Sequence, residues 1–227
     1  MSQGIFITFE GGEGVGKSTQ IHLLAERLRA ADYQVVTMRE PGGTPIGEKI
    51  RNILLNPTHT ELDAISELLL YEAARAQLVA ERIVPALETG AVVLCDRYTD
   101  STLAYQGVAR GLGKELVQTA NTIGSKGIKP QRTIVLMHDV EASLTNASKK
   151  GADRLEAEGV DFHTRVHEGF AEIAAAEPER VRTVSWQSAK EDTAALIFDE
   201  VSDLFPRAKD QSFEVTPELL KKIKGEK

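Results

Sequence analysis

The chain has 227 residues, of which 41% are hydrophobic and 27% are charged. These values are ordinary for a globular protein and exclude collagen-like, coiled-coil and disordered classes. The balance of 27 Lys and Arg against 34 Asp and Glu gives a net charge of −7, which argues against a general binder of nucleic acids or anionic membranes. No apolar run approaches the ~20 residues that span a bilayer, and the first residues do not form a signal peptide. We therefore expect a cytoplasmic protein with no nucleic-acid partner and no membrane contact.

Short runs of β-branched residues alternate with longer segments of helical periodicity along the chain. This alternation is typical of βαβ units, and it predicts an α/β fold: a doubly wound parallel five-stranded sheet with helices on both faces. The predicted strands cover residues 5–9, 34–38, 91–95, 133–137 and 182–184. The predicted helices cover residues 17–31, 45–55, 62–88, 101–109, 114–125, 141–149, 161–176 and 189–205.

The chain contains no internal repeat and no linker rich in Ser or Pro, so we expect one domain over residues 1–209. A polar segment at about 148–161 connects two predicted helices, and a long polar connection inside a compact domain is typically functional or mobile. Residues 210–227 form a basic C-terminal tail, in which Thr216-Pro217-Glu218 is typical of the start of a short helix.

A glycine-rich run follows the first predicted strand and begins a helix. The run is Gly11-Gly12-Glu13-Gly14-Val15-Gly16-Lys17-Ser18-Thr19, which matches the P-loop pattern G-x-x-x-x-G-K-[ST]. Its glycines let successive backbone N–H groups face a phosphate, and the helix N-terminus adds a partial positive charge there. We expect Lys17 to reach the β- and γ-phosphates of ATP and the Ser18 hydroxyl to ligate Mg²⁺. The whole run is therefore interpreted as an ATP-binding site.

Asp96 and Arg97 follow the predicted strand 91–95. An Asp at the carboxyl end of an apolar parallel strand can hold Mg²⁺ beside a P-loop, so Asp96 joins Ser18 as a predicted metal ligand. Arg97 offers a planar fork that can bridge an acceptor phosphate and the phosphoryl group in transfer.

Several further motifs make the chain resemble the thymidylate kinases from the P-loop through Phe205. They are Arg39-Glu40-Pro41-Gly42-Gly43-Thr44, Tyr71-Glu72-Ala73-Ala74-Arg75, Asp96-Arg97-Tyr98, Ser101-Thr102-Leu103-Ala104-Tyr105-Gln106-Gly107 and Asp153-Arg154-Leu155-Glu156. The resemblance implies a Mg²⁺-dependent homodimer that transfers the γ-phosphate of ATP to the 5′-phosphate of dTMP. The products would be ADP and dTDP, a step toward dTTP.

The resemblance also implies a dTMP-binding site. In it Tyr71 stacks on the thymine, Arg75 donates to its O4 and Thr102 faces its N3, with Ser101 and Gln106 beside them. A flat neutral base needs such an aromatic platform and a few directed polar groups.

The sugar and the phosphate of dTMP have their own implied contacts. Tyr105 lies under the sugar, where its ring excludes a ribose 2′-OH, and Glu13 approaches the 3′-OH. Pro41 forces Glu40 out of the helical region, so the chain turns there, and Arg39 is the expected phosphate ligand of this turn.

The catalytic set predicted from these motifs is Lys17, Arg97, Glu13 and Arg154. The attacking phosphate oxygen is already ionised, so catalysis needs alignment and charge neutralisation rather than a strong base. The resemblance implies that a catalytic cation comes either from inside the P-loop or from a lid. Since the variable P-loop positions hold no Arg, it implies a cation from the lid, here the segment at about 148–161.

The lid departs from the pattern of the family, because Thr145, Asn146 and Ser148 stand where Arg or Lys is expected. Of the remaining cations Lys149, Lys150 and Arg154, we predict that Arg154 acts, since it alone has a planar fork. This departure leaves the turnover rate open.

Three interpretations remain open from the sequence. The first is an active thymidylate kinase, and the second is a nucleotide-binding protein with weakened kinase activity that serves partner recognition. The third is a kinase for another nucleoside monophosphate. The retained acceptor-site residues favour the first, since a pure interaction module has no need of them.

Overall fold

The computed structural model describes residues 4–148 and 153–224. Within these ranges, five parallel strands form a sheet in the order β2-β3-β1-β4-β5. The strands are β1 (Ile5–Gly11), β2 (Val35–Arg39), β3 (Val92–Asp96), β4 (Arg132–Met137) and β5 (Val181–Ser185). All five predicted strands are confirmed to within two residues. The strand order reverses direction at β1, so the loop that follows β1 lies at the switch point where such sheets bind ligands.

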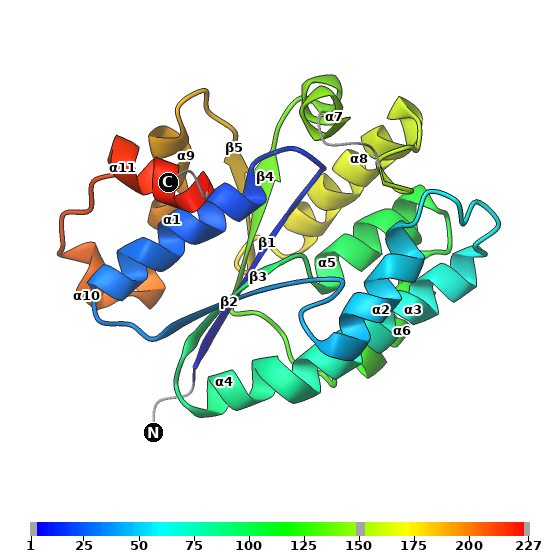
Figure 1. Ribbon diagram of the computed structural model, residues 1–227, viewed down its shortest axis with the longest axis horizontal. Coiled ribbons are helices and arrows are strands. Elements are labelled where there is room, and N and C mark those ends of the chain that lie inside the picture. Colours follow the sequence, from blue (N-terminus) through cyan, green and yellow to red (C-terminus); the bar gives the residue numbers. More distant parts are fainter. Residues whose placement is uncertain (1–3, 149–152, 225–227) are drawn as a thin grey trace.

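Helices cover both faces of the sheet, which confirms the predicted doubly wound fold (Figure 1). One layer contains α1 (Lys17–Ala30), α9 (Lys190–Asp199), α10 (Pro206–Lys209) and α11 (Pro217–Lys224). The other contains α2 (Pro45–Leu55), α3 (Ala64–Leu78), α4 (Val84–Glu88), α5 (Thr99–Thr102), α6 (Lys114–Gly124) and α8 (Val160–Ala176). Helix α7 (Val140–Ser148) follows β4 beyond the carboxyl edge of the sheet.

Alternate residues of β1 serve the two layers, as the period of two along a strand requires. Ile7 and Phe9 pack in the hydrophobic cluster of α1 and α9, whereas Phe6 packs in the cluster that contains Tyr98. Glu10 faces the same layer as Phe6 and is fully buried. A buried carboxylate needs hydrogen-bond partners, and those of Glu10 belong to the site described below.

Two predicted helices contain segments of a different kind. The predicted helix 62–88 consists of α3, a π-helical turn η1 (Val79–Ile83) and α4. Pro85 near the start of α4 has no backbone N–H, and the wider π turn accommodates the missing donor. The predicted helix 101–109 consists of α5 followed by a second π segment, η2 (Leu103–Ala109). Such π segments are frequent at functional sites, and η2 carries Tyr105 and Gln106.

The C-terminal part of the chain also differs from prediction. The predicted helix 189–205 ends at Asp199 and is followed by a 3-10 turn η3 (Ser202–Leu204) and then α10, which begins with the helix-starting Pro206. Helix α11 packs beside α1, where Lys222 Nζ donates to Glu26 at 2.9 Å. In the part of the chain that the structure describes, no helix combines the length and apolarity needed to cross a membrane.

Candidate active site

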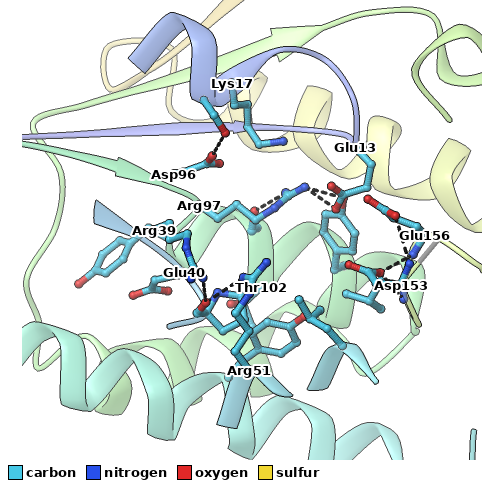
Figure 2. A pocket seen from close by; sticks show the side chains of 18 of the residues that line it. Glu13, Lys17, Arg39, Glu40, Arg51, Asp96, Arg97, Thr102, Asp153 and Glu156 are labelled. Atoms are coloured by element: carbon cyan, nitrogen blue, oxygen red, sulfur yellow. Dashed lines mark hydrogen bonds and ion pairs between the residues drawn. The ribbon is translucent and has the colours of Figure 1, made fainter. Parts of the chain in front are cut away.

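A cavity of about 680 Å³ opens at the carboxyl edge of the sheet, beside the P-loop and the ends of β2 and β3 (Figure 2). Most residues of the predicted nucleotide sites line it: Glu13, Gly14, Gly16, Lys17, Ser18, Thr19, Arg39, Pro41, Tyr71, Arg75, Asp96, Arg97, Ser101, Thr102, Tyr105 and Gln106. Gly12 and Val15 instead line a much smaller cavity on the other side of the loop. One continuous space therefore joins the predicted donor-phosphate site to the predicted acceptor site.

The P-loop has the backbone that its glycines permit. Gly14 and Gly16 have φ of 69° and 91°, in the left-handed region that other residues avoid. Lys17 begins α1, and its Nζ donates to the carbonyl of Gly12 at 2.6 Å and to that of Gly11 at 3.2 Å. Burial lowers the pKa of Lys17, and neighbouring Arg97 lowers it further. The ammonium group is thus held inside the loop, where phosphate oxygens would bind.

Ser18 and Asp96 meet at the start of α1 and the end of β3. The Ser18 hydroxyl donates to Asp96 Oδ2 at 2.8 Å, as the dashed line at the top of Figure 2 shows. Hydroxyl and carboxylate oxygens are hard ligands that suit Mg²⁺. Among the described residues, no group of three or more His, Cys, Asp or Glu side chains could hold a metal. This pair therefore fits an ion whose remaining ligands are phosphate oxygens and water, as in sites for nucleotide-bound Mg²⁺.

Arg97 links the end of β3 to the P-loop. Its φ is 69°, a left-handed conformation uncommon for a residue with a side chain, and its N–H donates to Phe9 O at 2.9 Å. Its guanidinium donates to Gly11 O and to Ser101 Oγ at 3.0 Å each, and to Glu13 at 2.6 Å. Figure 2 shows Arg97 and Glu13 meeting beside the loop. The strained backbone thus carries a preorganised guanidinium to the P-loop.

Glu13 and Tyr105 complete the contacts of Arg97. Tyr105 OH accepts from Arg97 at 3.2 Å and donates to Glu13 at 3.2 Å. Burial by itself raises the pKa of Glu13, but the charges of Arg97 and Lys17 outweigh it and hold this pKa below its usual range. Glu13 is therefore an anion at neutral pH, and its negative charge offsets the positive charges of Arg97 and Lys17.

Ser101 has a different setting from the one expected beside the base. Its hydroxyl donates to the buried Glu10 at 2.5 Å while accepting from Arg97, although it still lines the cavity. Glu10 also accepts from the N–H of Tyr98 at 2.8 Å. Burial, with a contribution from nearby Asp100, raises the pKa of Glu10 to about 8. Ser101 therefore links this carboxyl group to the Arg97 guanidinium.

Arg75 lies in a buried hydrogen-bond network at the far end of the cavity. Its Nε donates to Glu40 at 2.8 Å, its Nη1 to Glu72 at 2.6 Å and to Asn121 at 2.7 Å, and its Nη2 to Thr102 at 2.8 Å. Only 1% of the residue is exposed, yet it lines the cavity. These partners take four of its five N–H groups.

The two carboxylates of this network share one guanidinium. Burial raises the pKa of Glu40 to about 7 and also raises the pKa of Glu72, in both cases against the opposing charge of Arg75. One oxygen of each carboxylate has no hydrogen-bond partner among the described residues. The network therefore holds more acceptor atoms than Arg75 has N–H groups.

The aromatic residues of the predicted site lie where α3 and η2 face α8. Tyr71 is half-buried and lines the cavity, and burial raises the pKa of its hydroxyl. The Tyr105 ring packs edge-on against Phe162 at a centroid distance of 6.1 Å. Gln106 donates to Glu67 at 2.8 Å, which fixes its amide at the cavity wall. Tyr71, Tyr105 and Gln106 therefore all border this part of the cavity.

Arg51 lines the cavity and has no counterpart in the sequence prediction. Its Nη1 donates to Pro41 O at 2.9 Å, and Arg39 Nη1 donates to the same carbonyl at 3.1 Å. The peptide bond before Pro41 is cis. Two guanidinium groups therefore converge beside the turn that was expected to bind a phosphate, one from β2 and one from α2.

Arg154 occupies a different position from the one predicted. It is absent from the described lining of the cavity; its Nε donates to Leu54 O at 2.8 Å and its Nη2 makes a buried ion pair with Glu67. The guanidinium is held by these two buried acceptors and is not presented to the P-loop, so the catalytic role of Arg154, which requires closure of the lid, stays a prediction. The other candidate lid cations, Lys149 and Lys150, lie outside the described residues.

This placement predicts a structural effect for Arg154→Met, which keeps the volume and removes the charge. Glu67 retains Arg110 and Gln106 as partners, so we expect a loss of about 1–3 kcal/mol in the free energy of unfolding. We expect kcat to stay within about threefold of the unmodified protein. Urea unfolding and steady-state kinetics check both, with exposed Arg29→Met as the control. A 100-fold loss of kcat at unchanged stability would restore the catalytic assignment.

Comparison with known proteins adds the family. Residues 9–197 match the family model described as thymidylate kinase. The thymidylate kinase of Deinococcus radiodurans is 46% identical over 204 residues, covering 89% of this chain and 98% of the relative. That of Geobacter sulfurreducens is 46% identical over 211 residues, with 90% and 99% covered. A crystal structure of thymidylate kinase from Ehrlichia chaffeensis superposes with a TM-score of 0.72 at 33% identity, over 88% of this chain and 99% of that one.

Proposed function

The chain belongs to the thymidylate kinase family, and from this premise we propose how its residues transfer the γ-phosphoryl group of ATP to the 5′-phosphate of dTMP. The observation that supports this assignment is the single cavity that runs from the P-loop to Tyr71 and Arg75. A nucleotide-binding module without kinase activity has no use for such an acceptor pocket. The cavity therefore favours an active enzyme over a nucleotide-dependent interaction protein.

The P-loop run 11–19 holds the donor phosphates. Its backbone N–H groups and the N-terminus of α1 bind the β- and γ-phosphates, and Lys17 moves from the loop carbonyls onto their oxygens. Ser18 and Asp96 hold Mg²⁺, which when bound neutralises the polyphosphate charge that would repel an anionic acceptor. Asp96 thereby also orients the donor relative to β3.

The acceptor nucleotide lies along the rest of the cavity. Arg39, Arg51 and Arg97 surround its 5′-phosphate, and their planar forks can each bind two oxygens. Tyr71 stacks on the base, and Arg75 donates its remaining N–H to the ring carbonyl O4. Thr102, already bound to Arg75, accepts from the ring N3–H.

The sugar lies between these two groups. The Tyr105 ring is locked by Phe162 and by the hydrogen bonds of its hydroxyl to Arg97 and Glu13. A ring fixed in this way leaves no room for a 2′-OH, so the site prefers deoxyribose. Glu13, which borders the same space, accepts from the 3′-OH.

Transfer itself needs alignment of two anions and a cation between them. The attacking phosphate oxygen is ionised, so no general base is required. Arg97 binds the P-loop carbonyl of Gly11 and lines the cavity, which supports a role in which its fork contacts both the attacking oxygen and the transferring group. We assign to Arg97 the role that an Arg inside the P-loop or the lid would otherwise fill.

A coupled assay of ADP formation with ATP and Mg²⁺ tests this function. We expect rapid turnover with dTMP and at least about 100-fold lower kcat/KM with UMP, CMP or AMP, because those acceptors lack the matching base or carry a 2′-OH. Preference for one of the ribonucleotides would identify a kinase of different specificity. ATP consumption that no acceptor stimulates would contradict phosphotransfer altogether.

We also propose that the protein is a homodimer and acts in the cytoplasm. Large apolar side chains are exposed on α2, α3 and α6, which lie side by side in Figure 1. They are Ile46, Ile53, Ile65, Leu69, Leu116 and Ile123, of which Leu69 is 60% and Ile123 73% exposed. Large apolar side chains exposed on neighbouring helices are typical of a subunit interface. The cytoplasmic assignment follows from the substrates, which are nucleotides of the intracellular pool.

Leu69→Glu tests the dimer. A carboxylate at the centre of the apolar face would be buried against the partner without a counter-ion, so we expect the dimer dissociation constant to rise at least about tenfold. Leu196→Glu on α9 is the matched control, because Leu196 is also exposed, at 41%, but lies in the opposite layer. Sedimentation velocity over a concentration series measures both variants. A Leu69→Glu protein that assembles as tightly as the Leu196→Glu protein would place the interface elsewhere.

A further inference from the structure

Asn121 lies in α6 and does not line the cavity. It contacts Arg75, the residue that we propose donates to the acceptor base. It is 7% exposed. Its Oδ1 accepts from Arg75 Nη1 at 2.7 Å, and its Nδ2 donates to Thr99 O at 3.0 Å. An amide turned the other way would set N–H groups against N–H groups at Arg75 and oxygen against oxygen at Thr99. The orientation of Asn121 is therefore determined from both sides.

The packing of α6 on α3 fixes the position of this side chain. A Cβ atom at Gly124 would lie 2.0 Å from Glu72 Oε2, so glycine lets α6 pack on α3 without displacing the Glu72 carboxylate. Glu72 in turn accepts from the same Nη1 of Arg75 as Asn121 does. Both hydrogens of Nη1 are therefore held by residues that belong to the α3–α6 contact.

The remaining hydrogens of Arg75 are also assigned, with one exception. Nε is bound to Glu40 and one hydrogen of Nη2 to Thr102, which lines the cavity. The second hydrogen of Nη2 has no partner among the described residues. Because a guanidinium is planar and rigid, fixing Nη1 and Nε also fixes the direction of this last N–H.

We propose that Asn121 is a positioning residue for base selection: it holds the Arg75 guanidinium so that the one unassigned N–H meets a carbonyl of the acceptor base. The proposal rests on the proposed function, since it presupposes that Arg75 faces the base of dTMP. A pyrimidine with a carbonyl at this position satisfies the N–H. A pyrimidine with an amino group there, as in dCMP, sets donor against donor and leaves both unpaired.

The selectivity of three variants tests the role of Asn121. Asn121→Leu keeps a similar volume and removes the acceptor. Asn121→Asp keeps an oxygen that accepts from Arg75 and removes the donor to Thr99 O. Gln118→Leu is the control on the exposed side of the same helix. For each protein kcat and KM are measured with dTMP and with dCMP at saturating ATP, and thermal unfolding checks the fold.

In Asn121→Leu we expect the ratio of kcat/KM for dTMP over dCMP to fall at least about tenfold, through KM for dTMP with kcat within about threefold. In Asn121→Asp and Gln118→Leu the ratio should stay within about threefold of the unmodified protein. If Asn121→Leu does not fold, Asn121→Ser replaces it, since its side chain is too short to reach Arg75, and the same fall is expected.

Two results would overturn the proposal while leaving the proposed function intact: an unchanged ratio in the folded Asn121→Leu or Asn121→Ser protein, or an Asp variant that loses as much selectivity as the Leu variant. The failure of the proposed function would look different. In that case the unmodified protein itself would show no preference for dTMP over dCMP, and the inference about Asn121 would fall with it.

Discussion

Lys17→Ala is expected to lower kcat by on the order of 10²-fold or more while the protein stays folded. The ammonium group is already buried in the loop, bound to the carbonyls of Gly11 and Gly12, so it acts on the phosphates without first being desolvated. Charge on the transferring group and the leaving oxygen grows toward the transition state, and the loss of this cation therefore affects kcat more than KM. A 100-fold loss corresponds to about 2.7 kcal/mol of transition-state stabilisation.

Steady-state kinetics with ATP and dTMP give the kcat of the Lys17→Ala protein, and circular dichroism confirms that it is folded. Lys114→Ala is the matched control, because Lys114 is an exposed lysine of α6 that pairs with Glu172 at 2.6 Å and does not line the cavity. Near-normal turnover in folded Lys17→Ala would remove the P-loop from the mechanism.

Arg97→Lys is expected to have the second-largest effect, a fall in kcat of about 10- to 100-fold together with a higher KM for dTMP. The guanidinium of Arg97 binds Gly11 O, Ser101 and Glu13 at once, through two separate nitrogens. A lysine ammonium is a single point and cannot hold both the loop and the acceptor phosphate. Alignment of the two anions should therefore suffer even though the charge is retained.

The control for Arg97→Lys is Arg29→Lys, an exposed arginine that pairs with Glu26 in the last turns of α1, whereas the cavity lies at the first turn. Both variants keep the charge and lose the fork, so a difference between them isolates the contribution of the site. Equal kcat and KM in Arg97→Lys and the unmodified protein would identify the Arg97 contacts as purely structural.

The phosphate cradle can be predicted from sequence because its residues form one continuous run. The strand before it, the glycines and Lys17-Ser18 all lie within residues 5–18, and the backbone they require is local. The inner strands β1, β3 and β4 are predictable for a similar reason, since each is a short, mostly apolar run buried on both faces of a parallel sheet. The edge strands β2 and β5 are more exposed, but they are short runs rich in β-branched residues. The pairing of Ser18 with Asp96 followed from one general rule, that parallel strands end at the same edge.

The contacts of Arg154 could not be predicted from local sequence patterns. Its motif Asp153-Arg154-Leu155-Glu156 suggested a free cation of the lid, but its partner Glu67 lies 87 positions away on α3. Nothing in the four-residue motif indicates which distant carboxylate packs against it. The tertiary contact between the segment after the lid and α3 therefore determines the role of this residue.

The position of Arg51 in the sequence indicates a site residue, although no role was predicted for it. It lies four residues after Gly47 and three before Leu54, the two buried residues of α2, and so belongs to the buried stripe of an amphipathic helix. A charged residue on such a stripe must face a partner or a polar cavity. The π segment η2 left no comparable signal, because its wider turn depends on the packing of α5, α6 and α8 around it.

Transfer of label from ATP to dTMP tests the central claim most directly. Unmodified protein is incubated with ATP labelled at the γ-phosphate, Mg²⁺ and dTMP, and the products are separated by chromatography. We expect the label to appear in the β-phosphate of dTDP, in a 1:1 ratio to the ADP formed, and to be almost absent in the Lys17→Ala protein. Label found only in inorganic phosphate, or dTDP formed equally well by the Lys17→Ala protein, would contradict phosphoryl transfer within this cavity.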